Sequence, residues 1–181
     1  MAGAAIETGL DVLEVTLDSE RALEQIAAIR SAYPDAEIGV GSVLRAEQVP
    51  PAVAAGARFV VSPVVDPATI EVCGDLGVAS LPGGATPTEI HRAWEAGATA
   101  VKVFPIEQLG GPAYLRSISS PLGRPPLVPT GGVDSGNLGG YLEAGAIAVG
   151  IGGGVFPLTA LRERDVTSVT RLSRATMEAI Q

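Results

Sequence analysis

The 181-residue chain is long enough for one domain with a sizeable core, and its 46% hydrophobic residues, 4% aromatic residues and 23 glycines are typical of a parallel α/β protein. A formal net charge of −8 without a basic patch argues against a nucleic-acid partner. We expect no membrane span and no signal peptide, and one Cys with one His cannot assemble a zinc-type metal site.

Short apolar segments rich in β-branched residues predict buried parallel strands. In chain order they are residues 12–16, 37–41, 58–62, 78–81, 100–104, 127–130 and 146–150. Helices are expected between them, including one after the N-cap pair Asp66 and Pro67 and one after the capping box of Thr86 and Glu89. A final amphipathic helix is predicted over residues 166–180.

A weak internal repeat supports this alternation. A helix ends at a small residue followed by glycine, and then an apolar run begins, at Gly9, Gly56, Gly77, Gly97 and Gly145. Glycine at the position after a helix accommodates a positive φ. The intervals of 47, 21, 20 and 48 residues indicate a unit of one strand plus one helix.

The repeat predicts a single (β/α) barrel domain over residues 1–181. Seven βα units do not close a (β/α)8 TIM barrel, and the first residues read as the helix that would follow a first strand. We therefore expect either a TIM barrel that lacks its first strand or an open or altered barrel.

Lys102 is the only lysine, and it lies inside the apolar run Val101-Lys102-Val103-Phe104-Pro105. Burial of an ammonium group is costly and lowers its pKa. An amine with a lowered pKa is a nucleophile that can form a Schiff base with a carbonyl substrate. The alternative is a structural lysine that extends to solvent or pairs with one carboxylate.

Glu14 is a second charged residue in an apolar strand, within Leu13-Glu14-Val15-Thr16-Leu17. If Glu14 and Lys102 meet inside a barrel, the carboxyl group is a candidate general acid/base beside a nucleophilic amine. The alternative is a buried ion pair that only specifies packing. Ser42 follows another strand and either faces the barrel mouth or simply starts a loop.

Two glycine-rich strand ends lie 21 residues apart, at Thr130-Gly131-Gly132 and at Gly150-Ile151-Gly152-Gly153-Gly154. Backbone N–H groups at such positions can cradle a phosphate, and in TIM barrels the last two strands form a phosphate site. Two tight turns without a ligand are the alternative.

Six motifs in order resemble those of the 2-dehydro-3-deoxy-phosphogluconate (KDPG) / 4-hydroxy-2-oxoglutarate (KHG) aldolase family. They begin at Leu13, Gly39, Ser62, Leu81, Val101 and Pro129. The resemblance covers nearly the whole chain and implies a metal-free class I aldolase without a cofactor, with a (β/α)8 barrel fold and a homotrimeric assembly. Its partners would be a small 2-keto acid and a phosphorylated aldehyde, and the single Cys73 fits a reducing cytoplasm.

The resemblance implies a role for each matching residue. Lys102 would form the Schiff base and Glu14 would be the acid/base. The implied substrate-binding residues are Thr16, Ser42, Pro63, Phe104, Thr130, Gly131, Gly132, Gly152 and Gly153.

Two positions depart from the family pattern. Asp18 stands where an arginine pairs with the substrate carboxylate, and a carboxylate cannot replace that guanidinium. We expect Asp18 to cap a helix beginning near Glu20 instead. Gly154 stands where a serine contacts phosphate, so a phosphate would lose one hydrogen bond.

The sequence therefore predicts a Schiff-base aldolase that cleaves 2-dehydro-3-deoxy-6-phosphogluconate into pyruvate and glyceraldehyde 3-phosphate, in the Entner–Doudoroff type of carbohydrate metabolism. A 4-hydroxy-2-oxoglutarate or other 2-keto-3-deoxy acid aldolase is one alternative. An inactive ligand-binding barrel is the other, since Asp18 and the missing strand would both weaken the site.

Overall fold

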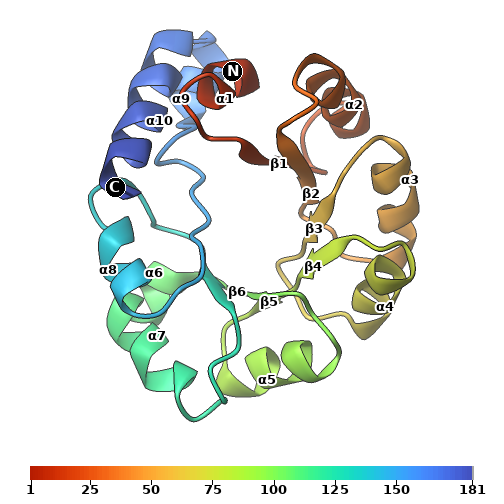
Figure 1. The fold of residues 1–181 in the computed structure, drawn as a ribbon, viewed down its shortest axis with the longest axis vertical. Helices are drawn as coiled ribbons and strands as arrows, with labels where there is room; N and C mark the ends of the chain where they lie inside the picture. Colours follow the sequence, from red (N-terminus) through yellow and green to blue (C-terminus); the bar gives the residue numbers. More distant parts are fainter. Residues whose placement is uncertain (181) are drawn as a thin grey trace. The chain divides into compact units, whose positions relative to one another are not determined.

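Parallel strand pairing organises residues 11–103 of the computed structural model, which describes residues 1–180 (Figure 1). A four-stranded sheet runs in chain order through β1 (Val12–Thr16), β2 (Glu37–Gly41), β3 (Phe59–Val61) and β4 (Ala79–Leu81). After β4, the two-residue strand β5 (Gly83–Gly84) pairs in parallel with β6 (Val101–Val103). All these pairings are parallel, as the near-continuous apolar runs predict.

The helices of this unit connect successive parallel strands and lie on one side of them (Figure 1). They are α2 (Ala22–Ala32), the 3₁₀ turn η1 (Ala46–Gln48), α3 (Val49–Ala54), α4 (Pro67–Asp75) and α5 (Pro87–Glu95). Both predicted caps are confirmed. Asp66 accepts a hydrogen bond from the Thr69 N–H, and Thr86 forms a reciprocal capping box with Glu89.

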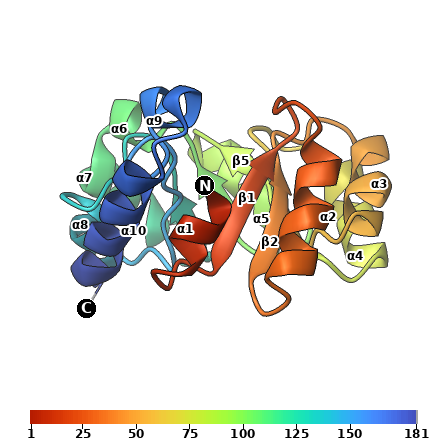
Figure 2. The ribbon, with the colours of Figure 1, turned by 90° about the horizontal axis from the view of Figure 1, so that it is seen from above.

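The second unit combines residues 1–10 with the chain from Phe104 onward. It holds α1 (Ala2–Ile6), α6 (Ile106–Leu109), α7 (Gly111–Ser119), β7 (Leu127–Pro129), α8 (Leu138–Glu143), α9 (Leu158–Glu163) and α10 (Val166–Ile180). Figure 2 shows α1 beside α10, so segments from opposite ends of the sequence pack together. The single domain expected from the sequence stays a prediction, because the chain has two compact units.

The predicted strand at 146–150 is wrong. The Gly150 N–H donates to the Pro129 carbonyl, but Gly150 forms only an isolated bridge with Thr130. Ile147 is 61% exposed, so this run lacks the burial on which the strand prediction depended. In contrast, β5 was not predicted, because two glycines carry no apolar signal.

The five repeat glycines adopt the predicted conformation. Gly9, Gly56, Gly77, Gly97 and Gly145 all have positive φ, between 66° and 105°. The repeat therefore marks helix ends correctly.

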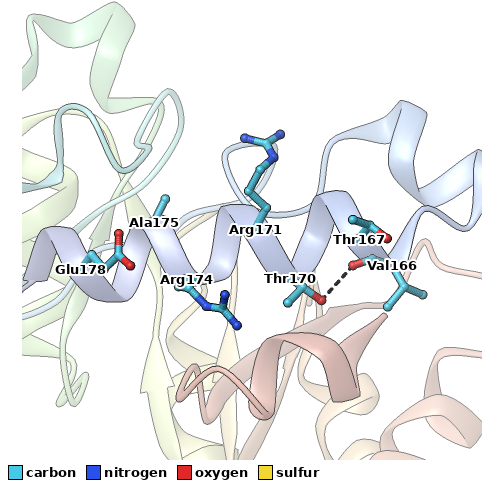
Figure 3. Close-up of a pocket in the computed structure, with 7 residues that line it drawn as sticks. All are labelled: Val166, Thr167, Thr170, Arg171, Arg174, Ala175 and Glu178. Carbon is cyan, nitrogen blue, oxygen red and sulfur yellow. Dashed lines mark hydrogen bonds between the residues drawn. The ribbon is translucent and has the colours of Figure 1, made fainter.

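Helix α10 has the predicted bounds but is only partly covered. Val169 is fully buried, whereas Val166 and Ile180 are each 49% exposed. A groove follows the helix, and Figure 3 shows Thr170 donating to the Val166 carbonyl there. None of the groove's lining residues belongs to the predicted site: they are Val166, Thr167, Thr170, Arg171, Arg174, Ala175 and Glu178. Among residues 1–180, no helix is long and apolar enough to cross a membrane.

Candidate active site

Lys102 is the central residue of β6 and is 9% exposed. Side chains alternate along a strand, so the fully buried Val101 and Val103 share one face and Lys102 lies on the other. Its backbone N–H donates to the Pro82 carbonyl at 2.9 Å, which fixes the strand beside the β4–β5 connection. The sequence prediction of a buried lysine in a strand is confirmed.

Glu14 lies in the middle of β1 and is solvent-exposed, contrary to the burial expected from its apolar neighbours. The same alternation explains the difference. Val15 is buried and Leu13 is half-buried on one face, while Glu14 points to the other. Exposure and desolvation coexist here, since the surrounding protein still removes enough water from the carboxyl group to raise its pKa.

Lys102 and Glu14, hereafter called the catalytic pair after the role predicted for them from the sequence, interact electrostatically. Burial lowers the pKa of the Lys102 amine, and the charge of Glu14 partly offsets that shift. Desolvation raises the pKa of Glu14, while the Lys102 charge opposes the rise. Both shifts bring the groups closer to the neutral forms that proton transfer and nucleophilic attack require.

Asp18 is not a helix cap. Helix α2 begins at Ala22, its N-cap is Arg21, and no side chain caps it. The exposed Asp18 acts instead on Glu14, because its negative charge raises the pKa of the Glu14 carboxyl. Sequence reasoning missed this interaction, although Asp18 follows Glu14 by only four residues.

Three predicted substrate-binding residues lie at or just after strand ends in the same unit as the catalytic pair. The Thr16 hydroxyl, at the end of β1, lies 3.2 Å from the Ser19 hydroxyl. Ser42 follows β2 with a φ of 56°, a left-handed conformation that is strained for a non-glycine residue. Pro63 follows β3, and its backbone packs so closely on Gly83 that a Cβ there would lie 2.8 Å from the Pro63 oxygen.

The other predicted residues belong to the second unit and lie in two glycine segments, residues 130–132 and 150–154. Gly131 and Gly132 have φ values of 94° and 81°. The Thr130 carbonyl accepts from the Ile106 N–H at 2.9 Å, which holds α6 to the first segment. Thr130 and Gly150 form an isolated parallel bridge, so the first residues of the two segments lie next to each other.

Phe104 and Gly131 also lie close together in this unit. A Cβ at Gly131 would be 3.2 Å from the Phe104 ring, which is 38% exposed. Gly152 and Gly153 are exposed, and a Cβ on either would meet nothing within 4 Å. These two glycines therefore offer bare backbone to solvent, as a phosphate cradle requires.

Gly154 differs from its neighbours because it is enclosed. A Cβ at Gly154 would lie 2.9 Å from the Asp134 Cβ and 2.9 Å from the Val133 oxygen. A serine does not fit there without a shift. The exposed Asp134 is an acidic residue that sequence reasoning missed. Its Cβ lies beside Gly154, and its Oδ1 accepts from the Gly136 N–H at 2.8 Å.

A buried amine with a lowered pKa beside a carboxyl group is the arrangement that the sequence predicts for a Schiff-base enzyme. A family model for KDPG and KHG aldolases matches residues 1–172. The chain belongs to this aldolase family, and the resemblance stated from its motifs is confirmed.

Similar proteins extend this match along the chain. The chain is 39% identical to a 2-dehydro-3-deoxy-phosphogluconate aldolase of Treponema pallidum, over 99% of this chain and 86% of that protein. It is 35% identical to the 2-dehydro-3-deoxy-6-phosphogalactonate aldolase of Escherichia coli, over 99% and 88%.

A solved structure supports both fold and chemistry. The KDPG aldolase of Legionella pneumophila, captured with pyruvate as a covalent carbinolamine, is 31% identical with a TM-score of 0.89, over 97% of this chain and 85% of that one. The predicted TIM-barrel-like α/β fold is therefore confirmed.

Proposed function

We propose that the chain is a class I aldolase in which Lys102 forms a Schiff base with a 2-keto acid and Glu14 moves the protons. The observation that carries the proposal is the pair itself. A buried lysine with a lowered pKa interacts with a carboxyl group whose pKa is raised. Burial disfavours the charge on each group, which favours proton transfer between them over a purely structural ion pair.

The reaction begins when the neutral Lys102 amine attacks the C2 ketone of the substrate. The carbinolamine loses water, with Glu14 supplying the proton, and gives a protonated imine. This iminium is an electron sink, so the C3–C4 bond breaks once Glu14 accepts the proton of the C4 hydroxyl. The bonding electrons pass into the enamine, and an aldehyde leaves. Protonation at C3 and hydrolysis then release pyruvate and restore the amine.

The strand-end residues hold the substrate in this proposal. Thr16, Ser42 and Pro63 share a unit with Lys102 and bind the pyruvyl end. Phe104 is assigned to substrate binding by the family resemblance. The glycine segments bind the substrate tail through their backbone N–H groups, since Gly152 and Gly153 are exposed and carry no side chain.

The substrate that the family favours is 2-dehydro-3-deoxy-6-phosphogluconate, which gives pyruvate and glyceraldehyde 3-phosphate. Activity of the Entner–Doudoroff type, a cytoplasmic location and a homotrimer accompany this proposal as expectations from the family resemblance. One of the similar proteins is named a phosphogalactonate aldolase. Gluconate-type and galactonate-type substrates differ in configuration at C4, so both epimers should be assayed.

A second substrate class, unphosphorylated 2-keto acids, is favoured by one observation. Gly154 lacks a hydroxyl and is packed against the Cβ of Asp134, an acidic residue whose negative charge disfavours a phosphate near position 154. The ratio of kcat/KM for phosphorylated and unphosphorylated substrates separates the two classes.

Trapping of the Schiff base tests the proposal. The protein is incubated with pyruvate and borohydride, and its intact mass and peptide map are measured. We expect one reduced pyruvyl adduct on Lys102, with release of pyruvate from the keto-acid substrates in a separate assay. A folded protein that gains no adduct would be a ligand-binding barrel without aldolase chemistry.

A further inference from the structure

Two glycines of β2 make room for side chains from the strands on either side. A Cβ at Gly39 would lie 2.3 Å from the Phe59 ring of β3. A Cβ at Gly41 would lie 1.6 Å from the Glu14 carboxylate oxygen Oε1 of β1. Neither glycine has a positive φ, so the backbone conformation would allow other residue types at both positions. Only the neighbouring side chains leave no room for a Cβ.

The register explains why Glu14 reaches Gly41. Glu14 is opposite Gly39 and Thr16 is opposite Gly41, so the Glu14 side chain leans along the strand direction to the position two residues further on. The Gly41 carbonyl accepts from the Leu17 N–H at 2.9 Å. This bond holds the β2 backbone in place, so a side chain at position 41 would displace the carboxylate and not the strand.

We propose that Gly41 is a positioning residue that lets the Glu14 carboxyl group lie flat against β2, where it interacts with Lys102. This inference rests on the proposed function, because it assigns to Gly41 the placement of the acid/base. It also explains why position 41 is a glycine, since its backbone conformation does not require one.

The two glycines predict opposite consequences for the same small change. In Gly41→Ala the methyl group meets the far end of a flexible, exposed side chain, which swings away at little cost to folding. The carboxyl group is then misplaced, and a displacement of about 1 Å can cost about 100-fold in rate. In Gly39→Ala the methyl group meets the ring of the half-buried Phe59, which has less freedom to move.

The experiment compares retro-aldol kinetics and thermal unfolding of Gly41→Ala with those of the matched control Gly39→Ala. For Gly41→Ala we expect kcat to fall about 10–100-fold with KM within about threefold of the parent protein. Its Tm should change by less than about 2 °C, whereas Gly39→Ala should lose about 2–6 °C and keep most of its kcat. Equal kcat values for Gly41→Ala and the parent would overturn the inference.

A double-mutant cycle with Glu14→Ala tests the contact itself. Once the Glu14 side chain is gone, alanine at position 41 has nothing to displace, so Gly41→Ala should lower kcat no further. If Gly41→Ala fails to fold, the double variant should fold, because the clash is removed. A double variant that also fails, or effects of the two changes that simply multiply, would mean that Gly41 acts independently of Glu14.

The pH dependence of pyruvate–borohydride labelling gives a readout that a merely structural role would not move. The Glu14 charge raises the pKa of Lys102, so displacing the carboxylate should lower that pKa and move the labelling midpoint to lower pH. Gly41→Ala should shift the midpoint and Gly39→Ala should not. If the parent protein is labelled but the pH midpoint of Gly41→Ala labelling is unchanged, this inference alone is overturned. Absence of labelling in the parent overturns the proposed function and this inference with it.

Discussion

The catalytic pair and the glycine segments are built in different ways. Glu14 and Lys102 are side chains in the middle of regular strands, and their directions follow from strand alternation. The glycine segments are strand ends and turns, and they use backbone groups, positive φ and close packing. The positions of the Glu14 and Lys102 side chains are therefore set by strand register. The space around the glycine segments depends instead on the side chains that pack against them.

The largest expected effect is on the catalytic pair. Lys102→Arg should abolish turnover and pyruvate–borohydride labelling, because a guanidinium group cannot form the imine. A coupled assay for pyruvate and the intact mass after borohydride check the two outcomes, with thermal unfolding as the control for folding. Turnover at the parent rate in this variant would contradict the assignment of the Schiff base to Lys102.

Glu14→Gln should slow turnover by about 10²–10⁴-fold, because the amide keeps the shape of the side chain but cannot exchange the proton. Binding of the substrate tail should change little if the glycine segments act separately. Steady-state kcat and KM check both expectations. An unchanged kcat would remove Glu14 from the mechanism, while an equal loss in kcat and in affinity would break the division between the two regions.

The sequence predicted the strands of the catalytic pair better than the irregular backbone of the glycine segments. The strands that carry Glu14 and Lys102 could be predicted, because an apolar run with one charged residue is a strong signal. The exposure of Glu14 could not, because periodicity shows that residues alternate but not which face meets solvent. The helix-end glycines were predicted correctly, since a positive φ is a local property.

Irregular backbone and contacts between distant residues account for what was missed. Residues 146–150 look like a strand in sequence, but Ile147 is exposed and only an isolated bridge forms at Gly150. The steric limits at Gly41 and Gly154 depend on side chains from other parts of the chain, Glu14 and Asp134. No local pattern in the sequence reports such a contact.

The glycine segments offer a smaller effect that tests phosphate preference. Gly154→Ser alone should not improve use of the phosphorylated substrate, because the new side chain meets Asp134 and the Val133 carbonyl. Asp134→Asn instead removes the acidic group and adds no side chain at position 154, so KM for the phosphorylated substrate should fall about 2–10-fold. Kinetics with the unphosphorylated substrate are the control, and the same change for both substrates would mean that this segment does not contact phosphate.

The smallest expected effect concerns Asp18, which links charge to the pH dependence of the catalytic pair. The negative charge of Asp18 disfavours ionised Glu14 and raises the pKa of that carboxyl. Asp18→Asn removes the charge, so the Glu14 pKa should fall and the acidic limb of the kcat–pH profile should move to lower pH. Asp18 is exposed, so salt at about 1 M should shrink the difference between the two proteins. A shift to higher pH, or one that salt does not change, would show that Asp18 acts by contact with another group and not through its charge on Glu14.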